Sequence, residues 1–328
     1  MRRRHFLQRG TAAVALGAGS PAAFLSGPLR AAEAPDFEAR DLDWVDARRQ
    51  RPVPVRLYLP AVSASPGRGL PLVVFSHGIG GTRRSFSWLG QHFAQHGIAS
   101  LHLQHVGSDR QLWSGNPLTL VGRLQAAAQD SEAIARAEDV HYALDTLLHG
   151  EGGARFDTRR IVAAGHSYGA NTTLLASGAR VPRPGGTIDL HDGRIAAAIV
   201  LSAPPFYGEP EPRKVLAPIA VPSLHITATE DVIRIPGYFS GLQDRVDVFN
   251  AIGGPKKWLV VYAGGDHNML SDRILAAGNP QNLQKKAATQ TLVLAFLQSV
   301  FEGDTDPMTR WPQQNAAVLA RFAEGHAG

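Results

Sequence analysis

Cysteine is absent from the 328-residue sequence, and this absence excludes several kinds of chemistry. Without thiols the chain can form no disulfide, no thiolate metal site and no cysteine nucleophile. Long apolar runs are lacking as well, since the mildly apolar residues 11–25 include glycine and proline and are too few for a good membrane span. The fold must therefore be held by an apolar core, and 44% hydrophobic residues is an ordinary globular content.

A large excess of one charge is also lacking beyond the amino-terminal segment. Residues 1–34 carry five arginines and one glutamate, whereas the rest of the chain has 28 basic and 27 acidic residues. A nearly neutral domain lacks the basic surface that nucleic-acid binding requires, so we expect no nucleic-acid partner.

Residues 1–34 have the layout of an export signal, with arginines first, then a mild apolar run, then small residues. The pair Arg3-Arg4 indicates the twin-arginine type, and the A-x-A pattern at 32–34 predicts a cleavage site. We therefore expect a periplasmic or secreted protein with a single domain over residues 35–328 and no stable membrane span after cleavage. An ordinary secretory signal and an uncleaved anchor are the alternatives.

Apolar segments of strand length alternate with helical patterns between Leu70 and Phe301. This alternation predicts an α/β fold, with a mostly parallel central sheet and helices on both faces. The pattern of residues 315–325 predicts a short terminal helix, and Ser131 is expected to cap a helix over 131–150. The expected strands lie in 71–77, 98–107, 160–167, 194–204, 221–229 and 256–264, and the other expected helices in 84–97, 168–178 and 283–301.

The stretch G-H-S-Y-G, residues 165–169, predicts a serine nucleophile at Ser167. The motif G-x-S-x-G is weak alone in a glycine-rich chain, but here it follows an expected strand and precedes an expected helix, as in a nucleophile elbow. Gly165 and Gly169 would leave room for the sharp turn and hold the serine strained at its tip. A tight turn without chemistry is the alternative.

Two further side chains follow expected strands in the order that completes a triad. Asp231 comes after the strand in 221–229 and His267 after the strand in 256–264. The order serine, acid, histidine is that of α/β-hydrolases. His267 would take the serine proton and return it to the leaving group, while Asp231 would fix the imidazole tautomer.

Three neighbouring residues are alternatives for the same roles. His166 could be the base, but a residue adjacent to the serine diverges from it at an elbow. Glu230 could be the acid in place of Asp231. Asp266 could also be the acid, although a residue next to the histidine seldom turns back onto its ring.

The loop F-S-H-G-I-G-G-T, residues 75–82, is expected to supply backbone N–H groups to an oxyanion. The expected donors are Tyr168, which follows the nucleophile, and Ile79 in this loop, with Gly78 as the alternative to Ile79. The glycines would let the backbone approach the substrate, and a simple glycine turn is the other interpretation.

We expect neither a cofactor nor a metal. His102 and His105 could be read as metal ligands, but no carboxylate is in register with them, and packing at a strand end is the better interpretation. Asp109 is expected to fix its loop. Four aromatic residues have expected places: Trp113, Phe206 and Tyr207 along the acyl or alcohol pocket, and Trp88 in a helix core.

The stretches around the loop 75–82, Ser167, Asp231 and His267 together resemble bacterial dienelactone-hydrolase-like proteins of the α/β-hydrolase superfamily. These are similar to platelet-activating-factor acetylhydrolases and to secreted polyester hydrolases and cutinases. The resemblance implies that Ile79 is the oxyanion donor of the H-G-I-G loop. True dienelactone hydrolases use a cysteine nucleophile, which this chain lacks, and Ala228 replaces the glycine of the usual G-x-x-D before the acid.

The expected activity is that of an exported serine esterase acting on small ester molecules with short acyl chains. An amidase or a polyester hydrolase would use the same side chains. A catalytically silent binding protein with a hydrolase fold is the alternative from a different class.

Overall fold

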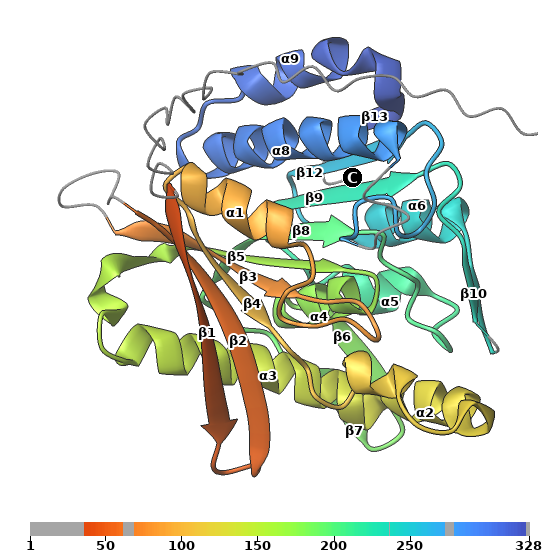
Figure 1. Cartoon of the computed structure of the whole chain (residues 1–328). Helices are drawn as coiled ribbons and strands as arrows, with labels where there is room; N and C mark the ends of the chain where they lie inside the picture. Colours follow the sequence, from red (N-terminus) through yellow and green to blue (C-terminus); the bar gives the residue numbers. More distant parts are fainter. Residues whose placement is uncertain (1–35, 62–68, 236, 273–278, 326–328) are drawn as a thin grey trace, which may run out of the picture. The chain divides into compact units, whose positions relative to one another are not determined.

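The computed structural model describes residues 36–61, 69–235, 237–272 and 279–325. The expected export segment therefore lies outside the described residues. The described part of the chain is built on a nine-stranded sheet in the order β1-β2-β4-β3-β5-β8-β9-β12-β13, shown in Figure 1. Within the described residues, no helix is both long and apolar enough to cross a membrane.

Neighbouring strands from β4 to β12 run parallel, and the strands at both edges are antiparallel. The expected mostly parallel sheet is thus confirmed. The sheet consists of β1 (Phe37–Asp46), β2 (Arg51–Pro60), β3 (Leu70–Ser76), β4 (Ala99–Leu103), β5 (Phe156–His166), β8 (Ile195–Leu201), β9 (Ser223–Ala228), β12 (Lys257–Tyr262) and β13 (Leu319–Gly325).

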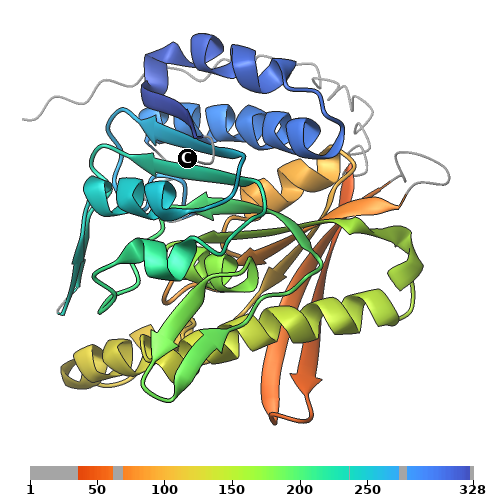
Figure 2. The ribbon, with the colours of Figure 1, turned by 180° about the vertical axis from the view of Figure 1, so that it is seen from behind.

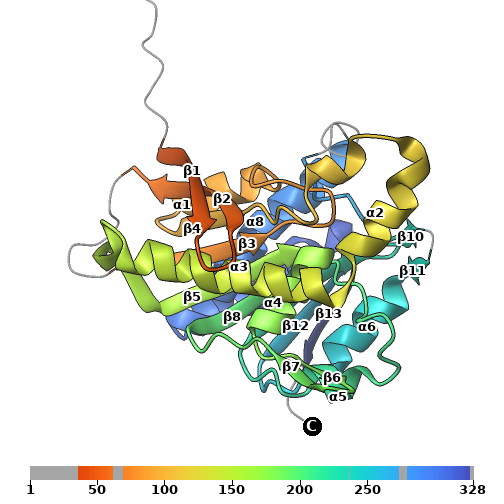
Figure 3. The same ribbon diagram turned by 90° about the horizontal axis from the view of Figure 1, so that it is seen from below.

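Helices cover both faces of the sheet, as Figure 1 and Figure 2 show from opposite sides. One face carries α1 (Ser87–Gln95), α8 (Pro280–Phe301) and α9 (Asp306–Gln314). The other carries α3 (Asp130–His149), α4 (Tyr168–Ala176), α5 (Pro212–Leu216) and α6 (Leu242–Ala251), with α3 and α4 in front in Figure 3. Outside these layers lie α2 (Leu120–Ala127) and two small hairpins, β6 (Arg180–Arg183) with β7 (Gly186–Asp189) and β10 (Ile233–Ile235) with β11 (Tyr238–Ser240).

The central strands are buried on both faces, which explains their continuous apolar sequences. In β3, Val73 and Phe75 pack toward α1 and α8, while Leu72 and Val74 pack toward α3. The carboxyl ends of β3, β5, β9 and β12 meet at one edge of the sheet, where ligands bind in open α/β folds.

The prediction of a helix over residues 315–325 is wrong. This segment forms a short 3₁₀ turn, Ala316–Val318, and then β13, which pairs antiparallel with β12. The apolar Leu319 and Phe322 fit helical spacing, but pairing with the edge of the sheet decides the backbone conformation. The expected Ser131 cap is also wrong, because the helix begins at Asp130 with Gln129 in the capping position.

Candidate active site

Ser167 lies at a strained turn between β5 and α4. Its backbone has φ 56° and ψ −123°, a conformation that costs free energy in a residue with a side chain. The turn is as tight as the sequence predicts: a Cβ on Gly165 would lie 2.2 Å from the carbonyl oxygen of Gly169, and one on Gly169 would lie 1.9 Å from that of Ser76. Gly165 therefore lets β5 and α4 approach one another, and Gly169 lets α4 approach the end of β3.

The side chains of Ser167, His267 and Asp231 form one continuous chain of hydrogen bonds. His267 Nε2 lies 2.8 Å from Ser167 Oγ, and His267 Nδ1 lies 2.7 Å from Asp231 Oδ1. An ionised carboxylate can only accept, so Nδ1 carries the proton and Nε2 accepts from the serine hydroxyl. Ser167 is 6% exposed and Asp231 is completely buried, so the imidazole connects a nearly enclosed hydroxyl to an enclosed carboxylate.

Asp231 has partners besides His267, and the sequence does not predict them. Burial alone would raise the pKa of Asp231, but the hydrogen bond and charge of His267, the charge of Arg245 and the Ser202 hydroxyl hold it well below its usual range. Thr227 Oγ1 donates to Oδ2 over 2.7 Å, and Arg245 Nη2 lies 3.4 Å from Oδ1. The carboxyl is therefore ionised near neutrality.

The three alternative residues lie outside this chain of hydrogen bonds. His166 Nε2 is 2.9 Å from the backbone carbonyl oxygen of His267, so its proton faces that carbonyl. Glu230 is exposed. Asp266 is exposed too, and it accepts from the backbone N–H of Asn268 over 2.8 Å.

The loop after β3 lies directly against Ser167. A Cβ on Gly78 would be 3.1 Å from Ser167 Cβ, so glycine allows this close approach. His77 Nε2 accepts from the backbone N–H of His105 over 3.0 Å, and its Nδ1–H therefore donates to Gly78 O over 2.7 Å. Gly78 C=O and Ile79 N–H belong to one planar peptide and point in opposite directions, so His77 fixes the direction of the Ile79 N–H.

The guanidinium of Arg136 in α3 is fully buried and contacts both the loop after β3 and the helix α4. It donates to the carbonyl oxygen of His77, to Ser108 Oγ over 2.7 Å and to Thr172 Oγ1 over 2.9 Å. It also lies 4.5 Å from the centre of the Tyr168 ring. Burial lowers the pKa of Arg136 to about 10, which leaves the group charged near neutrality.

A second Ser-His-Asp arrangement lies deep below the loop. His105 Nδ1 is 3.0 Å from Asp139 Oδ2, and His105 Nε2 is 3.0 Å from Ser76 Oγ. These side chains are at most 2% exposed, so substrate cannot reach them. Burial also holds the pKa of His105 well below its usual value. The hydrogen bonds among these three side chains fix the end of β3, from which the loop departs.

Two pockets flank Ser167. We name them the histidine-side pocket, about 490 Å³, and the helix-side pocket, about 510 Å³. Ile79 and Ser167 lie in both. The histidine-side pocket is lined by Gly78–Ser85 except Arg83, and by Phe86, Trp113, His166, Val232–Ile235, His267, Asn268, Ser271 and Asp272. The helix-side pocket is lined by Leu124, Ala128–Ser131, Ala133, Tyr168, Asn171, Leu175, Arg183, Pro204–Tyr207, Ile233, Ile235 and Tyr238.

Three of the four aromatic residues line the pockets beside Ser167, and Trp88 is only half-buried. Trp113 lines the histidine-side pocket and donates to Gly80 O over 3.0 Å, whereas Phe206 and Tyr207 line the helix-side pocket. Trp88 Nε1 donates to Leu270 O over 2.8 Å at the edge of the core.

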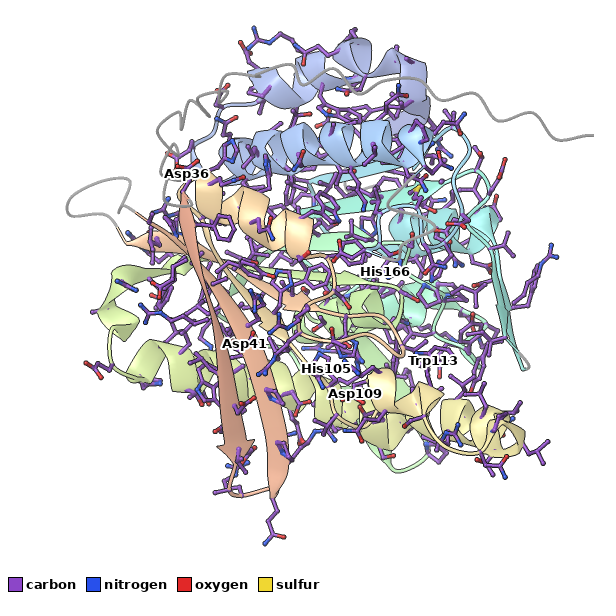
Figure 4. All side chains as sticks on the ribbon, viewed as in Figure 1. Asp36, Asp41, His105, Asp109, Trp113 and His166 are labelled. Carbon is purple, nitrogen blue, oxygen red and sulfur yellow. The ribbon has the colours of Figure 1, made fainter. Side chains whose placement is uncertain are left out.

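Asp109 fixes its loop as predicted, by accepting from Gln104 Nε2 and from the backbone N–H of Gln111. Figure 4 labels Asp109 beside His105 and Trp113, toward α2.

His102 packs between Phe75 and Tyr58 in the core. Among the described residues, no group of three or more histidine, cysteine or acidic side chains could hold a metal ion.

The sequence matches the alpha/beta hydrolase family over residues 73–327, and the chain belongs to that family. This membership supports hydrolase activity in general. A search among curated proteins finds no significant match.

Proposed function

We propose that the protein is a serine hydrolase that cleaves carboxylic esters through an acyl-serine intermediate. The observation that carries this proposal is the single imidazole, His267, that bonds to both Ser167 Oγ and Asp231 Oδ1. A serine hydroxyl is a weak nucleophile and needs such a base within hydrogen-bond reach. The strained Ser167 backbone and the loop packed against it support the same conclusion.

The chemistry follows from these positions. Ser167 Oγ attacks the ester carbonyl carbon while His267 Nε2 takes the hydroxyl proton, and the carbonyl oxygen becomes an oxyanion facing the N–H groups of Ile79 and Tyr168. When the intermediate collapses, the bond to the alcohol oxygen breaks and His267 gives that oxygen the proton. Water then attacks the acyl-serine by the same route and releases the acid.

The stretches around the loop 75–82, Ser167, Asp231 and His267 resemble those of dienelactone-hydrolase-like and platelet-activating-factor-acetylhydrolase-like esterases. We therefore propose esters of small molecules with short acyl chains as the first class of substrate. Amides and polyesters are the alternatives within the same chemistry. Residues 1–34 are proposed as a twin-arginine export signal, which would place the mature domain in the periplasm or outside the cell.

The test is the variant Ser167→Ala assayed on a short-chain nitrophenyl ester. We expect the turnover of the variant to fall by several orders of magnitude, since the nucleophile is lost. Activity at the wild-type level would refute the assignment. A silent binding protein would hydrolyse none of the esters in either form and would not react with a fluorophosphonate.

A further inference from the structure

The two pockets beside Ser167 have different occupants in the proposed acyl transfer, on which this inference rests. His267 must give its proton to the departing alcohol, so the alcohol lies on the side of His267. His267 lines the histidine-side pocket, and the lining of the helix-side pocket does not include it. The acyl group therefore occupies the helix-side pocket, next to Tyr168 and the first turns of α4.

The walls of the helix-side pocket are mainly apolar. They include Leu124 from α2, Leu175 from α4, Phe206 after β8 and Ile233 from the β10 hairpin. Tyr207 and Tyr238 lie edge to face with their ring centres 5.0 Å apart, and the hydroxyl of Tyr207 donates to Ser240 Oγ over 3.0 Å. These walls suit the hydrocarbon part of an acyl chain.

Two residues that line the same pocket each carry a buried polar atom without a partner. Asn171 Oδ1 and Tyr168 Oη are both buried, and neither has a hydrogen-bond partner among the described residues. Asn171 is only 7% exposed and follows Ser167 by one helical turn, so its side chain lies on the same side of α4 as the nucleophile. Buried polar atoms are nearly always bonded, so each of these two atoms needs a partner, either a water molecule or a bound group.

The chemistry of the two atoms restricts that group. Asn171 Oδ1 can only accept a hydrogen bond, whereas the phenol of Tyr168 can donate or accept. A methyl or methylene group satisfies neither atom, and a carbonyl cannot donate to Asn171. A hydroxyl can donate to Asn171 and accept from Tyr168.

We propose that the acyl group of the natural substrate carries a hydroxyl, so that the enzyme is selective for esters of hydroxy acids. The hydrocarbon of the acyl chain packs against the apolar walls while its hydroxyl bonds to Asn171 and Tyr168. Hydrolysis breaks the ester C–O bond, consumes one water and releases a hydroxy acid and an alcohol. The hydroxyl of the acyl chain is unchanged.

The test compares ethyl esters whose acids differ only in a hydroxyl or a methyl group at the same carbon. The pairs are 3-hydroxybutanoate with 3-methylbutanoate, and 6-hydroxyhexanoate with heptanoate. For the wild type we expect kcat/KM to be about 10-fold or more higher for the hydroxyl member of at least one pair, because the methyl member leaves buried polar atoms unbonded. Equal values in both pairs would overturn the proposal.

Three variants assign the preference to the pocket. Asn171→Leu and Tyr168→Phe each remove one unbonded polar atom, and we expect the hydroxyl-to-methyl ratio to fall toward one in the first and to drop severalfold in the second. Tyr207→Phe is the matched control, because its hydroxyl lies in the same pocket but already has Ser240 as a partner, so the ratio should persist. A ratio unchanged in both Asn171→Leu and Tyr168→Phe would overturn the assignment.

These outcomes separate this inference from the proposed function. Each ratio is taken within one variant, so a general loss of activity cancels. A protein that reacts with a fluorophosphonate and hydrolyses both members of each pair equally well refutes the hydroxyl preference alone. A protein that hydrolyses no ester and does not react refutes the proposed function.

Discussion

The guanidinium of Arg136 lies 4.5 Å from the centre of the Tyr168 ring and also donates to the carbonyl oxygen of His77. These two contacts join the residue after the nucleophile to the residue before the glycine loop. The two proposed oxyanion donors, Tyr168 and Ile79, are 89 positions apart in the sequence, and this one buried side chain holds both in place. Arg136 is therefore a positioning residue in the proposed mechanism.

The first prediction concerns the variant Arg136→Met. Without the guanidinium three buried acceptors lose a donor, so we expect the free energy of unfolding to fall by about 3 kcal/mol or more, as measured by urea denaturation. We also expect kcat to fall about 10-fold to 100-fold with little change in KM, because the oxyanion contacts form in the transition state. Arg180→Met, which removes an exposed pair with Asp189, should cost at most about 1 kcal/mol and leave kcat unchanged. Wild-type kcat in the Arg136 variant would contradict the positioning role.

The second prediction concerns the space above the nucleophile. In Gly78→Ala the new Cβ would lie 3.1 Å from both Ser167 Cβ and His166 Nδ1. We expect kcat to fall about 10-fold or more, since small displacements of the reacting groups are costly. Gly122→Ala in α2 has open space around it and should raise the free energy of unfolding by about 0.5–1 kcal/mol without changing kcat. If both alanine variants turned over equally fast, the close packing of Gly78 would have no catalytic role.

The third prediction concerns the acid. Asp231→Asn keeps the shape but favours the wrong imidazole tautomer, so kcat should fall by about 10⁴-fold, whereas the neighbouring Glu230→Gln should behave as the wild type. Because the pKa of Asp231 is held well below its usual value, protonation of this carboxyl should not limit kcat as the pH is lowered to 4. Steady-state rates of the wild type and the two variants, measured from pH 4 to 9, test both statements. Equal losses in the two variants would leave the acid unassigned.

The sheet and the three side chains of the site could be predicted from the sequence for one physical reason. Parallel strands end at a common edge, so residues that directly follow β5, β9 and β12 must lie near one another. The supporting contacts could not be predicted in this way. Arg136 bonds to His77 and Thr172, which are 59 and 36 positions away, and nothing in its own helix distinguishes it from an arginine facing solvent.

The ends of the domain were less predictable. The paired β1 and β2 carry many charged residues and only part of their surface is buried, so their apolar pattern is weak. In 315–325, a few apolar residues fit both a helix and a strand, and only the free edge of β12 decides between them. Pairing between strands, which the local apolar pattern does not show, thus determines both results.

The fourth prediction concerns stability against pH. Burial lowers the pKa of His225 to about 3, and this histidine is therefore neutral in the folded protein and charged in the unfolded chain below pH 6.5. Its contribution to the free energy of unfolding is fully present above pH 6.5 and is lost as the pH falls, by about 1.4 kcal/mol per pH unit. Urea denaturation of His225→Gln between pH 6.5 and 4.5 should show a pH slope smaller by about that amount. An identical slope in both proteins would contradict the buried, neutral state.

The most direct test of the central claim is the site at which a fluorophosphonate attaches, measured by mass spectrometry of the digested protein. We predict one phosphonyl group per chain, on the peptide that contains Ser167 and on that serine, and none in Ser167→Ala or in wild-type protein that is first unfolded. A folded protein that takes up no reagent, or takes it up on another residue, would contradict the assignment of Ser167 as the nucleophile.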